Sequence, residues 1–249
     1  METSAVKKPR FMSELAYVLA LPVLALGVTL MEKADFGVSM VVAPAYLLHL
    51  KLVTLHPFFT FGALEYMVQG ALLIVLCLIL RRFRPAWLFS FVTAVLYGFI
   101  LDGCMRLCGG LPVGTFFWRL LWYVLGMLLC SMGVSLMFHT YLAPEVYELF
   151  VKEIAARFGL RITRVKTVYD VSSALIGVVL SFVFFGLWRF EGVKLGTIVC
   201  AVVNGFLIGL CSKLLDRCFT FYDRFPLRRL FETETAPQTE KTVQKEEQP

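Results

Sequence analysis

Charged residues are scarce in this chain of 249 residues. Asp, Glu, Lys and Arg make up 17% of the sequence, hydrophobic residues make up 59%, and the mean hydropathy is +0.76. A soluble domain usually carries about 25% charged residues, because its surface faces water. The shortage of charge therefore excludes an ordinary soluble protein.

Residues and motifs that bind metal or carry out catalysis are also few. The three histidines, His49, His56 and His139, have no companion ligands at a metal-binding spacing, and the seven cysteines form no metal motif. The sequence contains no phosphate-binding glycine loop, no Gly-x-Ser-x-Gly turn and no His-Glu-x-x-His motif. We therefore expect no enzyme activity, no metal site and no cofactor.

Six long apolar segments dominate the sequence instead. They cover about residues 12–31, 58–80, 86–107, 117–138, 167–188 and 196–215. Because an α-helix rises ~1.5 Å per residue, each segment is long enough to cross a hydrocarbon core of ~30 Å. The sequence predicts an all-α membrane protein with six transmembrane helices, whose first partner is the lipid bilayer.

The basic residues indicate the orientation of these helices. Of the 24 Lys and Arg residues, 16 lie near span ends on the side of the N-terminus, and six lie on the other side. Basic residues that flank spans are retained in the cytoplasm. We expect a bacterial cytoplasmic membrane protein with both termini in the cytoplasm. The net charge of +6 then reflects topology, and no nucleic-acid partner is expected.

An internal repeat organises the six spans. Residues 27–31 resemble 133–137, residues 66–72 resemble 169–175, and residues 94–99 resemble 201–206, at offsets of 103 to 107. Each unit holds three spans, so the second unit enters the membrane from the opposite side. The sequence therefore predicts 3+3 inverted repeats, an architecture of many secondary transporters.

The expected organisation has four parts. They are a cytoplasmic N-terminus (1–11), repeat 1 (12–110), repeat 2 (111–218) and a cytoplasmic tail (219–249). From about residue 231 the tail has few residues that could be buried, which predicts disorder.

A short segment follows the first span of each repeat, at residues 37–50 and 144–158. In the second segment, the polar residues Glu145, Glu148, Lys152, Glu153 and Arg157 share one helical face. One interpretation is a short amphipathic helix at the membrane interface. The alternative is a re-entrant half-helix whose positive N-terminal end faces a ligand.

Several motifs resemble those of a known group of proteins. They include Pro144-x-x-x-Glu148-Leu149-Phe150, Val165-Lys166-x-x-Tyr169-Asp170 and Ala201-x-x-Asn204-Gly205-x-Leu207-Ile208. In these motifs the chain is similar to the YczE/YyaS/YitT group of bacterial membrane proteins over nearly all of residues 12–218. The resemblance implies a multi-span membrane fold and assigns no biochemical role.

Three acidic residues lie within the predicted spans, where an unpaired charge is costly. Glu65 and Asp170 lie at nearly equivalent positions of the two repeats, which favours a gating or ion-coupling role on each side of the membrane. Asp102 lies one helical turn from Arg106, so we expect these two to pair. Glu65 is the candidate proton carrier. The alternative for each acid is a structural role at the interface or in an ion pair.

Polar residues near the membrane midplane are candidates for substrate binding. Tyr97 and Asn204 occupy matching positions in the third and sixth spans, and Gln69 and Ser172 match in the second and fifth. Together with Ser173 they could line a polar cavity between the repeats. The alternative is that they only form hydrogen bonds between helices.

These observations favour a secondary transporter for a small molecule or ion, with its site at the repeat interface. The second candidate is a membrane scaffold or regulator that transports nothing, and the third is a channel. The substrate, the coupling ion and the formation of a homo-oligomer are left open by the sequence.

Overall fold

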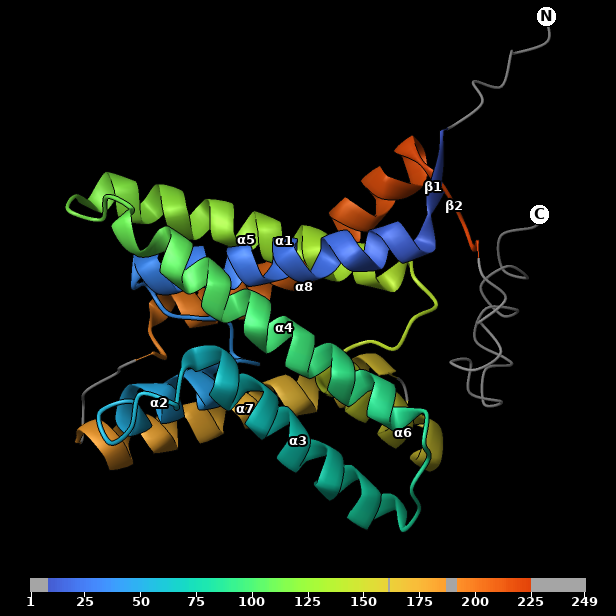
Figure 1. Cartoon of the computed structure of the whole chain (residues 1–249), viewed down its shortest axis with the longest axis horizontal. Coiled ribbons are helices and arrows are strands. Elements are labelled where there is room, and N and C mark those ends of the chain that lie inside the picture. Colours follow the sequence, from blue (N-terminus) through green and yellow to red (C-terminus); the bar gives the residue numbers. More distant parts are fainter. Residues whose placement is uncertain (1–8, 161, 187–191, 225–249) are drawn as a thin grey trace, which may run out of the picture.

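The computed structural model describes residues 9–160, 162–186 and 192–224. In these ranges the chain is almost entirely helical, as expected (Figure 1). In chain order the elements are β1 (Arg10–Met12), α1 (Ser13–Ala34), α2 (Ala43–Leu52), α3 (Phe61–Leu80), α4 (Trp87–Leu107), the short 3₁₀ helix η1 (Cys108–Gly110), α5 (Phe116–Phe138), α6 (Val146–Phe158), α7 (Ile162–Phe185), α8 (Leu195–Cys218) and β2 (Thr220–Tyr222).

Six helices of the described chain are long and apolar enough to cross a membrane, namely α1, α3, α4, α5, α7 and α8. The prediction of six spans is confirmed. The boundaries move by a few residues where local chemistry determines them. For example, α3 begins at Phe61 because the hydroxyl of Thr60 caps it and accepts a hydrogen bond from Ala63 N at 3.1 Å.

Helices α1 and α5 pack closely against each other and run antiparallel (Figure 1). At one end Arg119 Nε donates to Ala34 O at 2.9 Å, and at the other Tyr141 Oη donates to Glu14 Oε1 at 2.7 Å. Between these ends, a Cβ added at Gly27 would lie 2.6 Å from the backbone nitrogen of Cys130. Glycine is therefore required for this close helix contact.

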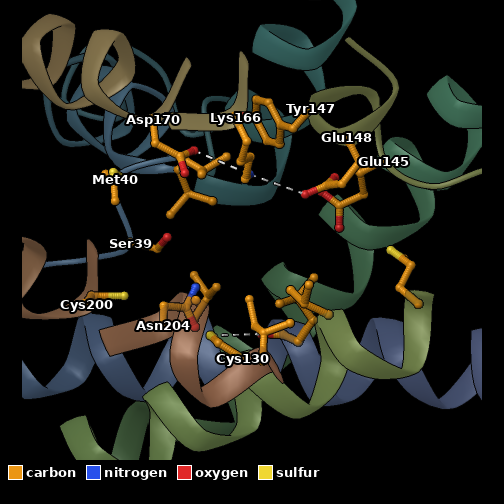
Figure 2. A pocket seen from close by; sticks show the side chains of 18 of the residues that line it. Ser39, Met40, Cys130, Glu145, Tyr147, Glu148, Lys166, Asp170, Cys200 and Asn204 are labelled. Carbon is orange, nitrogen blue, oxygen red and sulfur yellow. Dashed lines mark hydrogen bonds and ion pairs between the residues drawn. The ribbon is translucent and has the colours of Figure 1, made fainter. Parts of the chain in front are cut away.

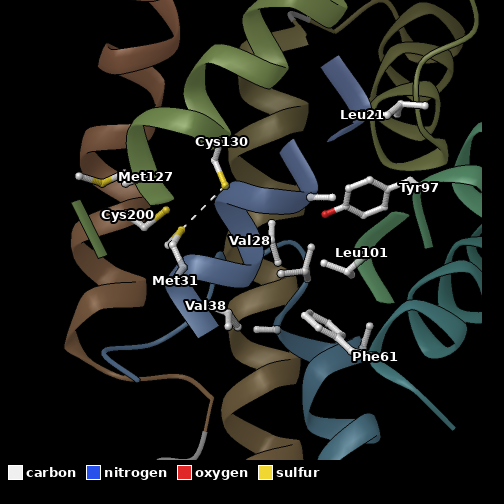
Figure 3. Close-up of a cluster of buried hydrophobic side chains, with 14 of the residues drawn as sticks. Leu21, Val28, Met31, Val38, Phe61, Tyr97, Leu101, Met127, Cys130 and Cys200 are labelled. Atoms are coloured by element: carbon white, nitrogen blue, oxygen red, sulfur yellow. Dashed lines mark hydrogen bonds between the residues drawn. The ribbon is translucent and has the colours of Figure 1, made fainter. Parts of the chain in front are cut away.

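Helix α4 packs on α1 and helix α8 packs on α5, through similar contacts. The hydroxyls of Tyr17 on α1 and Thr93 on α4 lie 2.6 Å apart, while the hydroxyl of Tyr123 on α5 donates to Gly196 O on α8 at 2.6 Å. The main hydrophobic core lies along α1, where Val28 and Met31 are buried (Figure 3). Side chains from α3, α4 and α5 complete this core, and they include Phe61, Tyr97, Leu101, Met127 and Cys130.

The two short helices lie toward opposite ends of the bundle (Figure 1). Helix α2 is near the end of α1, where the hydroxyl of Tyr46 donates to Glu32 at 3.5 Å, and it packs on α7. Helix α6 packs on α3 and on the start of α4, where Trp87 Nε1 donates to Glu153 at 3.3 Å. Each short helix therefore packs against a long helix from the other half of the chain.

The pairing of helices differs between the two halves of the chain. Helices α3 and α4 are in close contact at Gly62 and Gly98, since a Cβ on Gly62 would lie 2.7 Å from the carbonyl carbon of Gly98. Gly205 on α8 corresponds to Gly98 by sequence, yet an added Cβ there would have no heavy atom within 4 Å. Within their spans, α7 and α8 are only 17% and 11% buried. The second half is the more open one.

Asp102 does not have the partner that the sequence suggested. Its carboxylate accepts from Gly62 N at 2.8 Å and from the Thr60 hydroxyl at 2.6 Å, so it binds the first turn of α3. The expected pair with Arg106, one turn along the same helix, is replaced by these contacts because the backbone N–H groups at a helix start lack partners within the helix.

Two short strands next to α1 and α8 are an unexpected feature. β1 and β2 pair in parallel, with Arg10 opposite Thr220 and Met12 opposite Tyr222 (Figure 1). From the sequence, these residues were expected in the cytoplasmic N-terminus, at the start of the first span and in the cytoplasmic tail. The pairing places the start of α1 and the end of α8 on the same side of the bundle. The predicted disorder from about residue 231 lies outside the described residues.

Candidate functional site

A cavity of about 480 Å³ lies at the centre of the bundle (Figure 2). Its wall includes Leu24 and Cys130, which lie near the middle of α1 and α5 where these helices cross. The other helices of the wall contribute residues from the middle of α4 and α8, from the start of α6 and from the first half of α7. The cavity is thus lined by elements from both halves of the chain.

Both short helices begin at this cavity. Val42 is the N-cap of α2 and Glu145 is the N-cap of α6, and both residues are part of the wall. The first turns of the two helices are buried, with Ala43 and Val146 both 0% exposed. The N-terminal ends of α2 and α6 therefore lie inside the bundle, at the depth of the middle of the long helices.

One wall of the cavity carries most of its charge. Glu145, Glu148, Lys166 and Asp170 lie together on this wall, which α6 and α7 form (Figure 2). The amine of Lys166 is 3.8 Å from Glu148 Oε1 and 3.3 Å from Asp170 Oδ1. The single basic group of the wall is therefore already paired with two of its three carboxylates.

Glu145 is the third carboxylate, and its surroundings are unusual. The side chain is 4% exposed, and its Oε2 accepts a hydrogen bond from Gln69 Nε2 at 3.0 Å. Its Oε1 has no hydrogen-bond partner in the described part of the chain. Burial raises the pKa of Glu145 well above its usual value, and the negative charges of Glu148 and Glu65 raise it further.

Glu65 lies behind Glu145, away from the cavity wall. It is 0% exposed, and the amide of Gln69 is 3.5 Å from its Oε1. The same amide group binds Glu145, so Gln69 connects the two carboxyl groups. No Lys, Arg or His side chain of the described residues forms an ion pair with Glu65.

The opposite wall is mostly neutral. Ser39, Cys200, Asn204 and Cys130 lie across the cavity from the acidic side chains (Figure 2). The amide oxygen of Asn204 accepts from the Ser131 hydroxyl at 2.9 Å, so Asn204 both lines the cavity and joins α5 to α8. The structure thus shows the hydrogen bond between helices that the sequence gave as the alternative, and it also places Asn204 at the cavity.

The structure brings only some of the predicted site residues to the cavity. Tyr97, Asn204 and Asp170 line it, while Gln69 and Glu65 lie directly behind Glu145. Ser172 is exposed on α7, and Ser173 is 6% exposed but is not part of the wall. Neither serine belongs to the candidate site.

Glu65 and Asp170 do not lie at two separate ends of the molecule. Asp170 is linked through Lys166 to Glu148, and Glu65 is linked through Gln69 to Glu145. Both links end in the first turn of α6. The two acids predicted as gates on opposite sides therefore belong to one acidic group.

Sequence reasoning missed Glu145, Glu148 and Lys166 as site residues. Helical periodicity placed Glu145 and Glu153 on the polar face of α6, and the structure buries both side chains, which are only 4% and 3% exposed. The available signal for these residues was Pro144, which lies just before the N-cap of α6 and marks the start of the helix. A helix that begins inside the bundle also places its first acidic residues there. No group of three or more His, Cys, Asp or Glu side chains in the described residues could hold a metal ion.

The six apolar helices and the enclosed cavity define a multi-pass membrane protein that contacts the lipid bilayer. Residues 11–213 match the model of a family of unknown function, DUF6198, and the chain belongs to this family. No curated protein and no solved structure matches the chain.

Proposed function

We propose that the protein is a secondary transporter for a small solute, and that the central cavity is its binding site. The cavity itself carries this proposal. Its volume of about 480 Å³ lies within the range of small-molecule sites, roughly 300–1,000 Å³, and its wall combines an apolar majority with a few polar groups. A membrane scaffold has no need of such a cavity between its helices.

We further propose that the chain consists of two inverted repeats, as the sequence predicted. Antiparallel packing of α1 on α5 supports this arrangement, because helices related by a twofold axis in the membrane plane run in opposite directions. Tyr17 and Tyr123 support it too. They are separated by 106 residues, like Gly27 and Gly133, and each bonds to the fourth helix of its own repeat.

The difference between the halves fits alternating access. In this conformation α3 and α4 are in contact at Gly62 and Gly98, while Gly205 faces the cavity without a neighbour. If each repeat adopts the conformation that the other repeat has here, α8 moves toward α7 and α3 separates from α4. The site would then open toward the other side of the membrane.

The membrane and the orientation complete the proposal. The distribution of basic residues supports a cytoplasmic location for the side that holds β1 and β2. The similarity to the YczE/YyaS/YitT group supports a bacterial cytoplasmic membrane. The short helices α2 and α6 would be re-entrant, because their first turns lie at the depth of the cavity.

Counterflow in proteoliposomes tests the transport function. Purified protein is reconstituted into vesicles that are loaded with a mixture of unlabelled metabolites, and labelled members of the mixture are then added outside in trace amounts. We expect transient accumulation of at least one labelled solute above the level in protein-free vesicles. Accumulation of none of them over a broad panel would favour the scaffold.

A further inference from the structure

The carboxylate groups of the cavity exceed its basic groups. Glu145, Glu148 and Asp170 line the wall together with one amine, that of Lys166. Lys166 is 3.8 Å from Glu148 and 3.3 Å from Asp170, so it pairs with these two. Glu145 has no ion-pair partner among the described residues.

The free oxygen of Glu145 belongs to a buried side chain that lines the cavity. Oε2 is held by Gln69, which leaves Oε1 without a hydrogen-bond partner in the described part of the chain. A buried polar atom without a partner is costly, and native structures rarely keep one without a functional reason. A ligand that donates a hydrogen bond to Oε1 removes this cost.

The first N–H group of each helix that begins at the cavity is already hydrogen-bonded. At α2, Val42 N and Ala43 N both point to Ser39 O, at 3.2 and 3.0 Å, and Pro44 has no N–H. At α6, Val146 N donates to Gln69 Oε1 at 3.0 Å. An anion at either end would therefore lack the first N–H group of the helix, and it would also face the carboxylates of Glu145, Glu148 and Asp170 in the cavity wall.

We infer that the cavity binds a small organic cation with an apolar body, whose ammonium or guanidinium group donates a hydrogen bond to Oε1 of Glu145. This inference rests on the proposed transport function and names its substrate class. The apolar body fits the rest of the wall, where Val28, Val134, Met137 and Ile208 supply hydrophobic surface. Tyr97 adds an aromatic ring near the same site.

Binding of the cation displaces a proton. Burial and the nearby carboxylates raise the pKa of the Glu145 carboxyl group, which favours its protonated form when the cavity is empty. When the cation enters, the proton leaves for the solvent, and the carboxylate pairs with the positive group. One positive charge replaces another at the same oxygen, so the coupled process is an exchange of a cation for a proton.

Other titratable groups surround Glu145 on every element packed against it. The charged ones are Glu65 on α3, Glu148 on α6 and Lys166 on α7. The phenols and the thiol are Tyr17 on α1, Tyr97 on α4, Cys130 on α5 and Tyr147 on α6. Lys166 is the one base in this set, and Glu148 and Asp170 already pair with it.

The test uses ligands that share a phenyl body and differ in charge. Phenethylammonium, phenylguanidinium and trimethylphenylammonium are the cations, phenethyl alcohol is the neutral compound and phenylacetate is the anion. Binding to the full-length protein in detergent is followed by the melting temperature, and proton release is followed in weakly buffered solution near pH 7. We expect at least one cation to raise the melting temperature and to release about one proton per bound ligand.

Two glutamates on α6 provide the variants. Glu145→Gln keeps the hydrogen bond with Gln69 but lacks the charge, so cation affinity should fall at least about ten-fold and proton release should stop. Glu153→Gln is the matched control. Glu153 is a buried acid of the same helix that bonds to Trp87 and Arg82 away from the cavity, and this variant should bind as the wild type does.

A second variant covers the case in which Glu145→Gln does not fold. Glu145→Asp keeps the charge, so it should retain proton release with weaker binding. The inference is overturned if none of the cations binds, if phenylacetate binds more tightly than all three, or if Glu145→Gln binds a cation as tightly as the wild type does. The proposed transport function can fail separately, since cation binding with proton release but without counterflow would refute the transporter alone. Counterflow of only neutral or anionic solutes would refute the cation site alone.

Discussion

Gln69 on α3 and Glu145 at the start of α6 are joined by a hydrogen bond between the two halves of the chain. Gln69 Nε2 donates to Glu145 Oε2 at 3.0 Å, and Gln69 Oε1 accepts from Val146 N at 3.0 Å. One amide thus binds both the N-cap side chain and the first backbone N–H of α6. Because α6 begins at the cavity, this pair determines where Glu145 lies.

Replacement of Gln69 should therefore destabilise the protein. In Gln69→Leu, Glu145 Oε2 and Val146 N lose their partners inside the bundle. Each unsatisfied buried group costs about 1–3 kcal/mol, so the free energy of unfolding should fall by at least that amount. Thermal unfolding in detergent measures the change. The control is Ser172→Leu on the exposed face of α7, which should melt near the wild-type temperature; equal melting of all three proteins would contradict a structural role of the pair.

The raised pKa of Glu145 predicts how stability depends on pH. Its neutral form is favoured in the folded protein, because burial and the charges of Glu148 and Glu65 oppose ionisation. Its contribution to stability is therefore fully present below the usual glutamate pKa of 4.5, and it is lost as the pH rises through the higher pKa of the folded state. Melting curves across this range should show the loss in the wild type. The curve of Glu145→Gln should be flatter, and parallel curves for the two proteins would show that folding does not shift the pKa of Glu145.

Two corresponding glycines should respond differently to alanine. In Gly62→Ala the new Cβ meets the backbone of Gly98, and such overpacking costs about 1–3 kcal/mol. In Gly205→Ala the Cβ meets no heavy atom within 4 Å, so stability should stay the same or rise. Melting temperatures of the two variants in one detergent provide the comparison. A larger loss for Gly205→Ala would show that α7 and α8 pack more closely than described above.

Local sequence patterns predicted the long helices and part of the site. Each span is a continuous apolar run longer than a bilayer requires, and such runs are the clearest signal in a membrane sequence. Tyr97 and Asn204 were identified because polar residues in the middle of apolar spans need a partner or a cavity. Both residues do line the central cavity.

The missed residues depend on contacts that are distant in sequence. Glu145 is buried because Gln69, 76 residues earlier, binds it, and no local pattern on α6 carries that information. The pairing of β1 with β2 joins residues 210 positions apart, Arg10 with Thr220. Helical periodicity alone predicts that an acidic stripe faces water. This prediction fails where another helix covers the stripe.

The orientation can be tested with cysteine labelling from outside the cell. Gly110 lies in the connection between α4 and α5, and an added Cβ meets nothing within 4 Å there, so Gly110→Cys should be accessible. Cys218 is exposed at the other end of the bundle. An impermeant thiol reagent should label Gly110→Cys well above the wild-type background in intact cells, and Cys218 should react only after the membrane is opened. Labelling of Cys218 in intact cells would reverse the orientation.

The most direct test of the transport proposal fills the cavity without disturbing the bundle. Gly205→Phe adds a ring at a position that lines the cavity and has free space beside it, whereas Val202→Phe adds the same ring on the 76% exposed outer face of α8. Counterflow in proteoliposomes is measured for both variants and for the wild type, with melting temperatures as the control for folding. The account predicts that Val202→Phe accumulates solute as the wild type does, while Gly205→Phe melts normally and accumulates none. Full counterflow by a correctly folded Gly205→Phe would show that the solute does not pass through this cavity.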